Sequence, residues 1–200
     1  MAGITARQGQ PGRRRRGATL EDAILAAVWD ELTAHGYAAL TMEKVAVRAQ
    51  TSKQVLYRRW RNRAELVLTA VRHRWSSLAD DTPDTGTLRG DIVALLERMA
   101  RRYREIGPDV AHGLMAEMDD LSPEFLNVVQ GTMRTLLLRA EARGEVRLDA
   151  IPARAVTLPA DLLRHEMLLT NRPVTEAAIT EIVDGIYLPL LDALDARLPK

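Results

Sequence analysis

Apolar residues recur every three or four positions over most of this chain, which is the spacing of one face of an α-helix. The first such run consists of Leu20, Ile24, Val28 and Leu32. Thr19 and Asp22 form a plausible capping box before it. Glycine commonly ends a helix, and Gly36 follows the run. The pattern therefore predicts a helix from about Thr19 to Gly36.

Two short helices are predicted next, separated by a polar break. Thr41 is a suitable N-cap for a helix that ends near Arg48, and Ser52 is a suitable N-cap for one that ends near Tyr57. The polar residues 50–52 interrupt the apolar pattern between them. This arrangement predicts a tight turn between two helices.

The rest of the chain is predicted to form longer helices separated by breaks that contain Gly or Pro. "DDTPDTGT" (80–87) is the clearest loop. Asn62 with Glu65 opens the first of these helices, which covers residues from about 62 to 79. The others cover residues 88–107, a short segment after Pro108, 122–144, 153–170 and 175–197. Pro159 and Pro189 lie inside the last two, so each should kink or restart there. No alternating pattern is longer than "EVRL", and we expect an all-α fold of about nine helices.

Charge divides the chain into two parts. Residues 1–63 contain twelve Lys/Arg and five Asp/Glu, a net charge of +7, whereas residues 64–200 carry −6. A basic segment joined to an acidic one favours a polyanionic partner for the basic segment. Residues 1–17, rich in Gly, Gln and Arg, are expected to form a flexible basic arm. The alternative is a disordered tail with no partner.

Composition narrows the class of protein further. The chain has 200 residues, 46% of them hydrophobic, and no cysteine, which excludes disulfides and favours a reducing compartment. No run approaches the roughly 18 apolar residues of a membrane helix. The segment after the N-terminal arginines carries four acids, unlike a secretory signal. We expect a cytoplasmic protein with no cofactor and no metal.

The segment "TMEKVAVRAQTSKQVLYRRW" (41–60) has the features of a helix-turn-helix. The first short helix can brace the second, which enters the major groove of DNA, and the capped helix N-termini suit phosphate. Lys53, Gln54 and Val55 fall in the first turn of the second helix. There Lys can donate to guanine, Gln can pair with adenine, and Val can cover a thymine methyl group.

These residues resemble the N-terminal domain of TetR-family (tetracycline-repressor-like) transcriptional regulators. The family pattern is a threonine that opens the second helix, Ala-Gly-Val-Ser, two variable residues, Thr-Leu-Tyr, an aromatic residue and a lysine. The corresponding parts of this chain are Thr41, "AQTS" (49–52), "VLY" (55–57), Trp60 and Arg63, preceded by "HGYAALT". The resemblance implies domains of residues 18–63 for DNA binding and 64–200 for ligand binding and dimerisation.

Three residues depart from the family pattern. Gln50, Thr51 and Val55 replace Gly, Val and Thr. The glycine position often requires a positive φ, where another residue costs on the order of 1 kcal/mol. The expected fold survives these changes, but base preferences inferred from relatives do not.

The resemblance implies phosphate contacts from Thr41, Tyr57 and Arg63, with Arg58 or Arg59 as assistants. The basic arm could lie in the minor groove, which attracts arginine where it narrows. The candidate DNA-binding residues are Thr41, Ser52, Lys53, Gln54, Val55, Tyr57, Arg58 and Arg63, with Arg13, Arg14, Arg15 and Arg16 of the arm. The alternatives are a half-buried Tyr57 without a DNA role and arginines that form only a solvated face.

The second domain is expected to form a homodimer. Residues 143–191 resemble the C-terminal domain of one group of TetR-family proteins, in which the last two long helices pair with those of a second protomer. The last helix also carries an apolar stripe too broad for one neighbouring helix. The candidate interface residues are Ile179, Ile182, Val183, Ile186 and Leu190. The alternative is a helix buried within its own protomer.

A pocket for a small-molecule effector is expected among the helices of the second domain, because methionine and aromatic side chains make adaptable apolar walls. The candidate lining residues are Trp75, Tyr103, Leu114, Met115, Met118, Phe125, Met133, Leu137 and His165. The alternative for each is an ordinary core residue. "EMDD" (117–120) suggests a metal site only weakly, and a solvated helix end explains it better.

The sequence therefore predicts a sequence-specific, DNA-binding transcriptional regulator, a repressor that a small-molecule effector releases from a palindromic operator. One rival is an all-α enzyme with Glu117 and His165 in a helical pocket, although no catalytic motif supports it. Another is a nucleoid-type binder that recognises charge alone and ignores base sequence.

Overall fold

The computed structural model describes residues 12–74, 82–117, 123–170 and 174–197, with side chains from Thr19 onward except at 123–127 and 170. These residues form helices and connecting loops with no strand, so the all-α prediction is confirmed. The chain divides between His73 and Arg74 into two compact units. No helix in the described ranges is long and apolar enough to cross a membrane.

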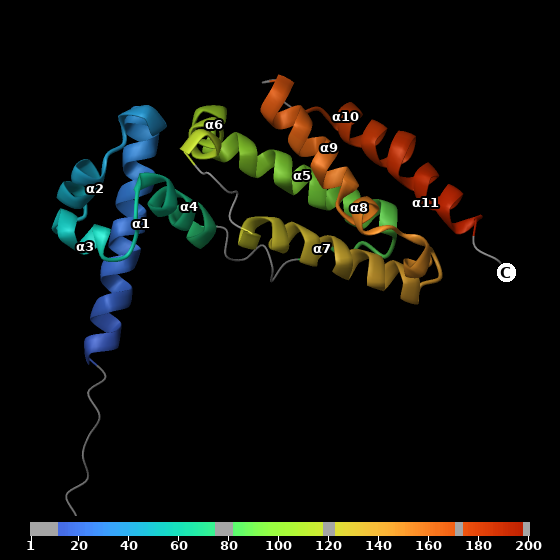
Figure 1. Ribbon diagram of the computed structural model, residues 1–200, viewed down its shortest axis with the longest axis horizontal. Helices are drawn as coiled ribbons and strands as arrows, with labels where there is room; N and C mark the ends of the chain where they lie inside the picture. The colour runs from blue at the N-terminus through green and yellow to red at the C-terminus, as the bar shows by residue number, and fades with distance from the viewer. Residues whose placement is uncertain (1–11, 75–81, 118–122, 171–173, 198–200) are drawn as a thin grey trace, which may run out of the picture. The chain divides into compact units, whose positions relative to one another are not determined.

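The described residues of the first unit form four helices (Figure 1). They are α1 (Gly12–Ala39), α2 (Met42–Arg48), α3 (Lys53–Tyr57) and α4 (Arg63–Arg74). Three of these helices start where the sequence predicted a cap. The Thr41 hydroxyl accepts a hydrogen bond from the Lys44 amide at 3.3 Å, and the Ser52 hydroxyl accepts one from the Val55 amide at 3.4 Å. The Asn62 side-chain oxygen accepts from the Glu65 amide at 2.8 Å, which satisfies an otherwise free amide of α4.

The start of α1 was predicted wrongly. The helix begins at Gly12, so the backbone of the four arginines is helical and Thr19 is not its cap. Arginine and alanine are strong helix formers, which explains how the helix extends toward the N-terminus without a cap at Thr19. Residues 12–17 of the predicted arm therefore have a helical backbone, and residues 1–11 lie outside the described ranges. The predicted break at Gly36 is confirmed by its φ of 74°.

The core of the first unit anchors the short helix α3. Leu56 is fully buried, and Trp60, just after α3, is 4% exposed. The Trp60 indole nitrogen donates to the Thr69 hydroxyl on α4 at 3.0 Å. The other large buried apolar residues of this unit are Ile24, Leu25, Val28, Leu32, Tyr37, Leu40, Met42, Val45, Leu66, Val67 and Val71. A helix of five residues is unstable alone, so packing through Leu56 and Trp60 holds α3 in place.

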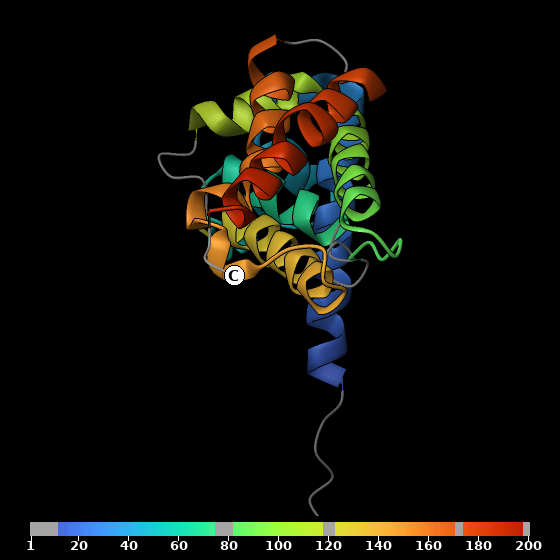
Figure 2. The ribbon, with the colours of Figure 1, turned by 90° about the vertical axis from the view of Figure 1, so that its right-hand side faces the viewer.

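The second unit is built around α5 (Leu88–Ile106), which packs against α7, α9 and α10. The remaining elements are α6 (Pro108–Glu117), α7 (Pro123–Ala142), a 3₁₀ turn (Leu148–Ala150), α8 (Ala153–Val156), α9 (Leu158–His165), α10 (Glu176–Thr180) and α11 (Leu188–Asp195). A π-helical segment, Glu166–Thr170, continues α9, and another, Glu181–Tyr187, joins α10 to α11. Figure 2 shows α10, the segment Glu181–Tyr187 and α11 as one nearly continuous rod, the last rod of the chain.

Both prolines act where the sequence predicted. The predicted helix 153–170 is divided at Thr157, and Pro159 stands in the first turn of α9. Pro189 is the second residue of α11, which begins where the π-helical segment Glu181–Tyr187 ends. Proline has no amide to donate and its ring clashes with the carbonyl four residues earlier, so the wider π turn accommodates it without breaking the rod.

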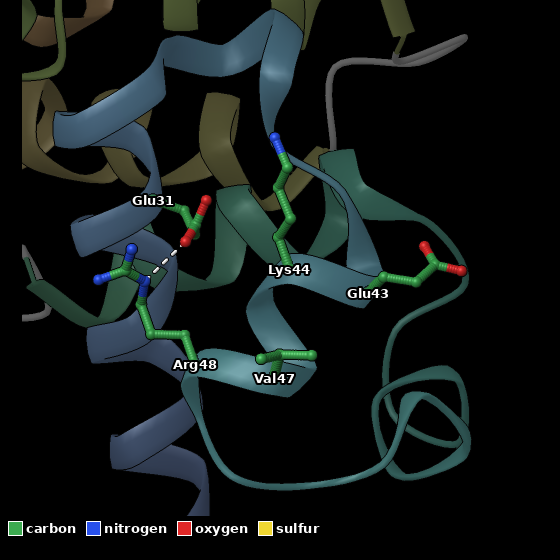
Figure 3. Close-up of a pocket in the computed structure, with 5 residues that line it drawn as sticks. All are labelled: Glu31, Glu43, Lys44, Val47 and Arg48. Carbon is green, nitrogen blue, oxygen red and sulfur yellow. Dashed lines mark hydrogen bonds and ion pairs between the residues drawn. The ribbon is translucent and has the colours of Figure 1, made fainter.

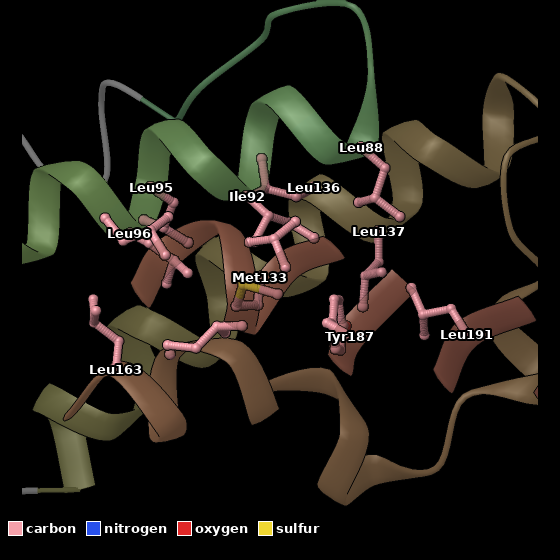
Figure 4. Packing of buried hydrophobic residues seen from close by; sticks show 14 of the residues in the cluster. Leu88, Ile92, Leu95, Leu96, Met133, Leu136, Leu137, Leu163, Tyr187 and Leu191 are labelled. Carbon is pink, nitrogen blue, oxygen red and sulfur yellow. The ribbon is translucent and has the colours of Figure 1, made fainter. Parts of the chain in front are cut away.

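The core of the second unit is closed and apolar (Figure 4). Its fully buried members include Ile92, Leu96, Met133, Leu136, Leu137, Leu163, Val183 and Tyr187. One charged group is also fully buried, the carboxylate of Asp91 in the first turn of α5. It accepts from the Thr85 amide at 2.5 Å, the Thr85 hydroxyl at 2.8 Å and the Arg143 guanidinium at 3.2 Å. These bonds offset the cost of burying the charge and tie the loop before α5 to the end of α7.

Candidate nucleic-acid interface

The first turn of α3 points its polar side chains into solvent. Lys53 and Gln54 are exposed, Val55 is partly buried, and Leu56 on the opposite side lies in the core. Because Leu56 fixes the helix from behind, the outward face has a defined orientation. The structure therefore offers an amine, an amide and a small apolar group side by side at a helix N-terminus, which are the groups that can contact base edges.

Lys53 is held from two sides. Its ammonium nitrogen donates to a carboxylate oxygen of Glu43 on α2 and lies 5.5 Å from the ring centroid of Tyr57. The hydrogen bond to Lys53 lowers the pKa of Glu43, and the bond to Glu43 raises the pKa of Lys53. Both groups are charged at neutral pH. The sequence analysis assigned no role to Glu43, because its pairing across ten residues and two helices leaves no periodic signal.

Tyr57 and Arg58 extend the exposed face beyond α3. The Tyr57 side chain is 49% exposed, and Arg58 is also exposed. Arg59 instead forms an ion pair with Glu21 on α1. Thr41 and Ser52, the two cap residues, are both exposed at the N-termini of α2 and α3. These positions leave Thr41, Ser52, Tyr57 and Arg58 accessible to a phosphate backbone.

Arg63 has partners that the sequence did not predict. One guanidinium nitrogen donates to the carbonyls of Tyr37 at 3.4 Å, Ala38 at 3.3 Å and Leu40 at 3.0 Å. The guanidinium also lies 4.9 Å from the Tyr37 ring centroid. These carbonyls belong to the end of α1 and the segment after it. Carbonyls at a helix C-terminus have no amide of the next turn to bond with, and Arg63 supplies a donor. Arg63 therefore fastens the start of α4 to the end of α1.

An ion pair between the exposed Arg48 of α2 and the buried Glu31 of α1 joins these two helices (Figure 3). The Arg48 guanidinium donates to a carboxylate oxygen of Glu31 at 2.6 Å, and His35 contacts the other oxygen at 3.1 Å. The Glu31 side chain is only 5% exposed. The hydrogen bond from Arg48 lowers the pKa of Glu31, against the opposing effect of burial. Figure 3 also shows that Arg48 and Glu43 extend to opposite sides of α2.

The turn between α2 and α3 has the positive φ that was expected at position 50, where the family pattern has glycine. Gln50 has a φ of 51°, the left-handed region that favours glycine. The amides of Gln50 and Thr51 donate to carbonyls of α2 at 3.1 and 2.9 Å. The turn therefore keeps its hydrogen bonds even though Gln replaces Gly.

The candidate pocket residues that the structure describes differ in their burial. Met133 and Leu137 lie in the closed core, whereas Met115 and His165 are exposed. That these residues line a pocket for an effector stays a prediction. Leu114 is buried on α6, and the Tyr103 hydroxyl donates to the Met167 carbonyl at 2.7 Å. Trp75 and Met118 lie outside the described residues, as does the Phe125 side chain.

The candidate dimer residues separate into two groups. Ile179, Ile182 and Val183 are buried within the protomer, in the cluster that contains α5 and α7. Their burial needs no second chain, and their place in a dimer interface stays a prediction. Ile186 is 42% exposed and Leu190 is partly exposed. An apolar surface on the last rod is therefore limited to these two positions among the five.

The possible metal site at residues 117–120 is only partly described. Glu117 is exposed at the end of α6, and residues 118–120 lie outside the described ranges. Within the part of the chain that the structure describes, no group of three His, Asp or Glu side chains could hold a metal ion.

Comparisons with known proteins match both units. A family model described as "Bacterial regulatory proteins, tetR family" matches residues 24–70, and one described as "Tetracyclin repressor-like, C-terminal domain" matches residues 82–186. The chain is 30% identical over 183 residues to the DNA-binding transcriptional repressor TetR of Mycobacteroides abscessus, covering 88% of this chain and 96% of the relative. It is 32% identical over 177 residues to an HTH-type transcriptional regulator of Mycobacterium tuberculosis, covering 86% and 87%.

Solved structures show the same fold at lower identity. The Thermus thermophilus repressor FadR, solved in complex with lauroyl-CoA, superposes with a TM-score of 0.63 at 16% identity, covering 90% of this chain and 96% of that one. The dihydroxyacetone kinase operon activator DhaS superposes with a TM-score of 0.60 at 13% identity, covering 89% and 99%. A repressor and an activator thus share this architecture.

Proposed function

The chain belongs to the tetR family of bacterial regulatory proteins and is a DNA-binding transcriptional regulator, and from this premise we propose that α3 reads bases in the major groove. The observation that carries the proposal is the anchored first turn of α3. Lys53 and Gln54 face solvent there while Leu56 is fixed in the core. Lys53 can donate to guanine O6 or N7, and Gln54 can pair with adenine N6 and N7.

Phosphate contacts would set the position of this helix on the duplex. Thr41, Ser52, Tyr57 and Arg58 are exposed around α3 and supply hydroxyl groups and one guanidinium. The N-termini of α2 and α3 add backbone amides with a positive dipole end. Arg63 contributes by fixing α4 to α1, whatever contact its remaining donors make with DNA. The arginines of residues 13–16 would add affinity without base preference.

The regulator is proposed to act as a homodimer on a palindromic operator. One five-residue helix can contact few bases, whereas two copies about 34–36 Å apart can read successive major-groove faces. Ile186 and Leu190 on the last rod are the candidate contacts. Because its target is the chromosome, we place the protein in the cytoplasm.

Repression, with release by a small-molecule effector, is the proposed mode of regulation. It is supported by the repressor from Mycobacteroides abscessus, which the chain matches over most of its length. The effector would bind the second unit and favour a protomer arrangement in which the two α3 helices no longer match the operator. A ligand shifts such an equilibrium only by its different affinity for the two states. The protein acts by binding, without a catalytic step.

Selection of bound fragments from genomic DNA, followed by sequencing, tests this function. A palindromic site is expected. On that site Lys53→Ala and Gln54→Ala should each change preference at particular base pairs by about 1–3 kcal/mol, while Arg58→Ala should weaken all sequences alike. Arg104→Ala, an exposed arginine of α5, is the matched control and should change neither. Equal losses on every sequence from the variants at Lys53, Gln54 and Arg58 would contradict the assigned roles.

A further inference from the structure

We propose that Glu43 is a specificity-determining residue, whose carboxylate holds Lys53 away from backbone phosphates until the lysine meets a suitable base. The inference rests on the proposed function, because it assigns a role to a neighbour of the reading helix. It adds a residue from α2 that makes no proposed contact with DNA.

The contact between the two side chains is direct and lies on the exposed face. Glu43 is in the first turn of α2, two residues after the cap Thr41, and Lys53 is the first residue of α3. The Lys53 nitrogen donates to a Glu43 carboxylate oxygen, and the two side chains are 45% and 59% exposed. The pair therefore stands in solvent at the edge where α3 would meet the duplex, and it contributes little to the core.

A carboxylate imitates the phosphate oxygen that a lysine meets on any DNA. Binding without base preference arises from lysine and arginine contacts to phosphates. To use Lys53 in that way, the protein must break the bond to Glu43 and bring a phosphate near a negative charge. The guanine O6 and N7 atoms lie in the groove and carry no formal charge. Lys53 can reach them without drawing a further phosphate toward Glu43.

Tyr57 limits where the released ammonium group can go. Its ring centroid lies 5.5 Å from the Lys53 nitrogen, and such contacts attract a cation. Lys53 is thus held between a carboxylate on α2 and a ring on its own helix. The effect of removing Glu43 should be modest, because exposed ion pairs are weak.

The test measures affinity of the full-length protein for the selected operator and for a duplex of arbitrary sequence at several salt concentrations. Glu43→Gln should bind the arbitrary duplex roughly two- to fivefold more tightly than the wild type. The slope of log affinity against log salt should become more negative by about 0.9, because one more phosphate is neutralised. Operator affinity should change less, so the ratio of the two affinities should fall. Glu97→Gln, an exposed acid on α5, removes the same charge elsewhere and should change neither.

A second experiment, in Lys53→Met protein, distinguishes the effect of the Glu43–Lys53 pair from a general repulsion between Glu43 and DNA. In Lys53→Met protein, the added Glu43→Gln change should no longer tighten binding to the arbitrary duplex. If the gain persists there, Glu43 acts by long-range repulsion and the inference is overturned. Loss of operator affinity in Glu43→Gln alone would also overturn it, because Glu43 would then contact a base. A wild type that shows no preference for any sequence would overturn the proposed function itself, and with it this inference.

Discussion

At Gln50, a single backbone conformation links the sequence to the geometry of the reading helix. The residue has a φ of 51° in the turn between α2 and α3, where a side chain crowds the backbone. The turn keeps its shape because its amides are bonded to α2 and because Leu56, six residues later, is buried. Packing of α3 therefore outweighs the local preference of glutamine.

Replacing Gln50 with glycine should stabilise the protein. Glycine removes the strain of positive φ, although it also makes the unfolded chain more flexible, so the gain in free energy of unfolding should be about 0.5–1 kcal/mol. Denaturant unfolding monitored by circular dichroism measures it. Gln50→Ala is the matched control, because alanine keeps the strain and should give no gain. A destabilised glycine variant would show that the glutamine side chain makes a necessary contact.

Between elements, hydrogen bonds and ion pairs connect helices of the first unit through residues that lie far apart in the sequence. Arg63 connects α4 to the carbonyls that end α1, and Arg48 connects α2 to the buried Glu31 of α1. The two links fix the helices on either side of α3. Disrupting either link should therefore lower the free energy of unfolding of the protein without DNA. Replacing an exposed group such as Arg58 should not.

The Glu31–Arg48 link should make stability depend on acid pH. The pKa of Glu31 is lowered from the ordinary value of 4.5 in the folded protein, so the carboxylate stabilises the folded state above that value. This contribution should be lost as pH falls through the lower, folded-state pKa. Unfolding of the wild type and Glu31→Gln, measured from pH 7 downward, should show a difference in stability that shrinks below about pH 4.5.

The exposed acid Glu97 provides the control for this measurement. Glu97→Gln is expected to unfold like the wild type throughout, because it removes a solvent-exposed acid of α5. A Glu31→Gln variant as stable as the wild type at neutral pH would mean that the ion pair contributes no net stability there, as some buried pairs do not.

At the scale of the whole molecule, a palindromic operator requires two copies of α3 and therefore two protomers. Most of the apolar stripe of the last rod is used inside the protomer, where Ile179, Ile182 and Val183 complete the core around α5. Ile186 remains 42% exposed on the same rod. A second protomer that covers Ile186 would remove this apolar surface from water, and it would also supply the second α3 that a palindrome requires.

Ile186→Glu should convert the proposed dimer into a monomer. Light scattering or sedimentation at micromolar concentration should show the lower mass, because a charge would be buried at the interface. Affinity for the palindromic operator should fall at least tenfold as the second reading helix is lost, which corresponds to about 1.4 kcal/mol. Met115→Glu is a matched control, since Met115 is also 42% exposed but lies on α6. A monomeric wild type under DNA-binding conditions would reject the dimer.

The sequence by itself determined the local parts of this protein. The caps at Thr41, Ser52 and Asn62, the breaks at Gly36 and Pro159, and the spacing of the helix-turn-helix were all legible, because each depends on residues within one or two helical turns. The same local signals revealed the family, since its motif consists of neighbouring residues. The start of α1 was missed because a helix needs no cap signal where its residues favour helix.

The tertiary structure decided which side chains meet. Lys53 pairs with Glu43, Glu31 with Arg48, and Arg63 with the carbonyls at the end of α1. The same packing places Ile179, Ile182 and Val183 in the core and leaves His165 exposed. These outcomes depend on how helices pack against one another, and periodicity along one helix shows only that a face is apolar, not which neighbour covers it.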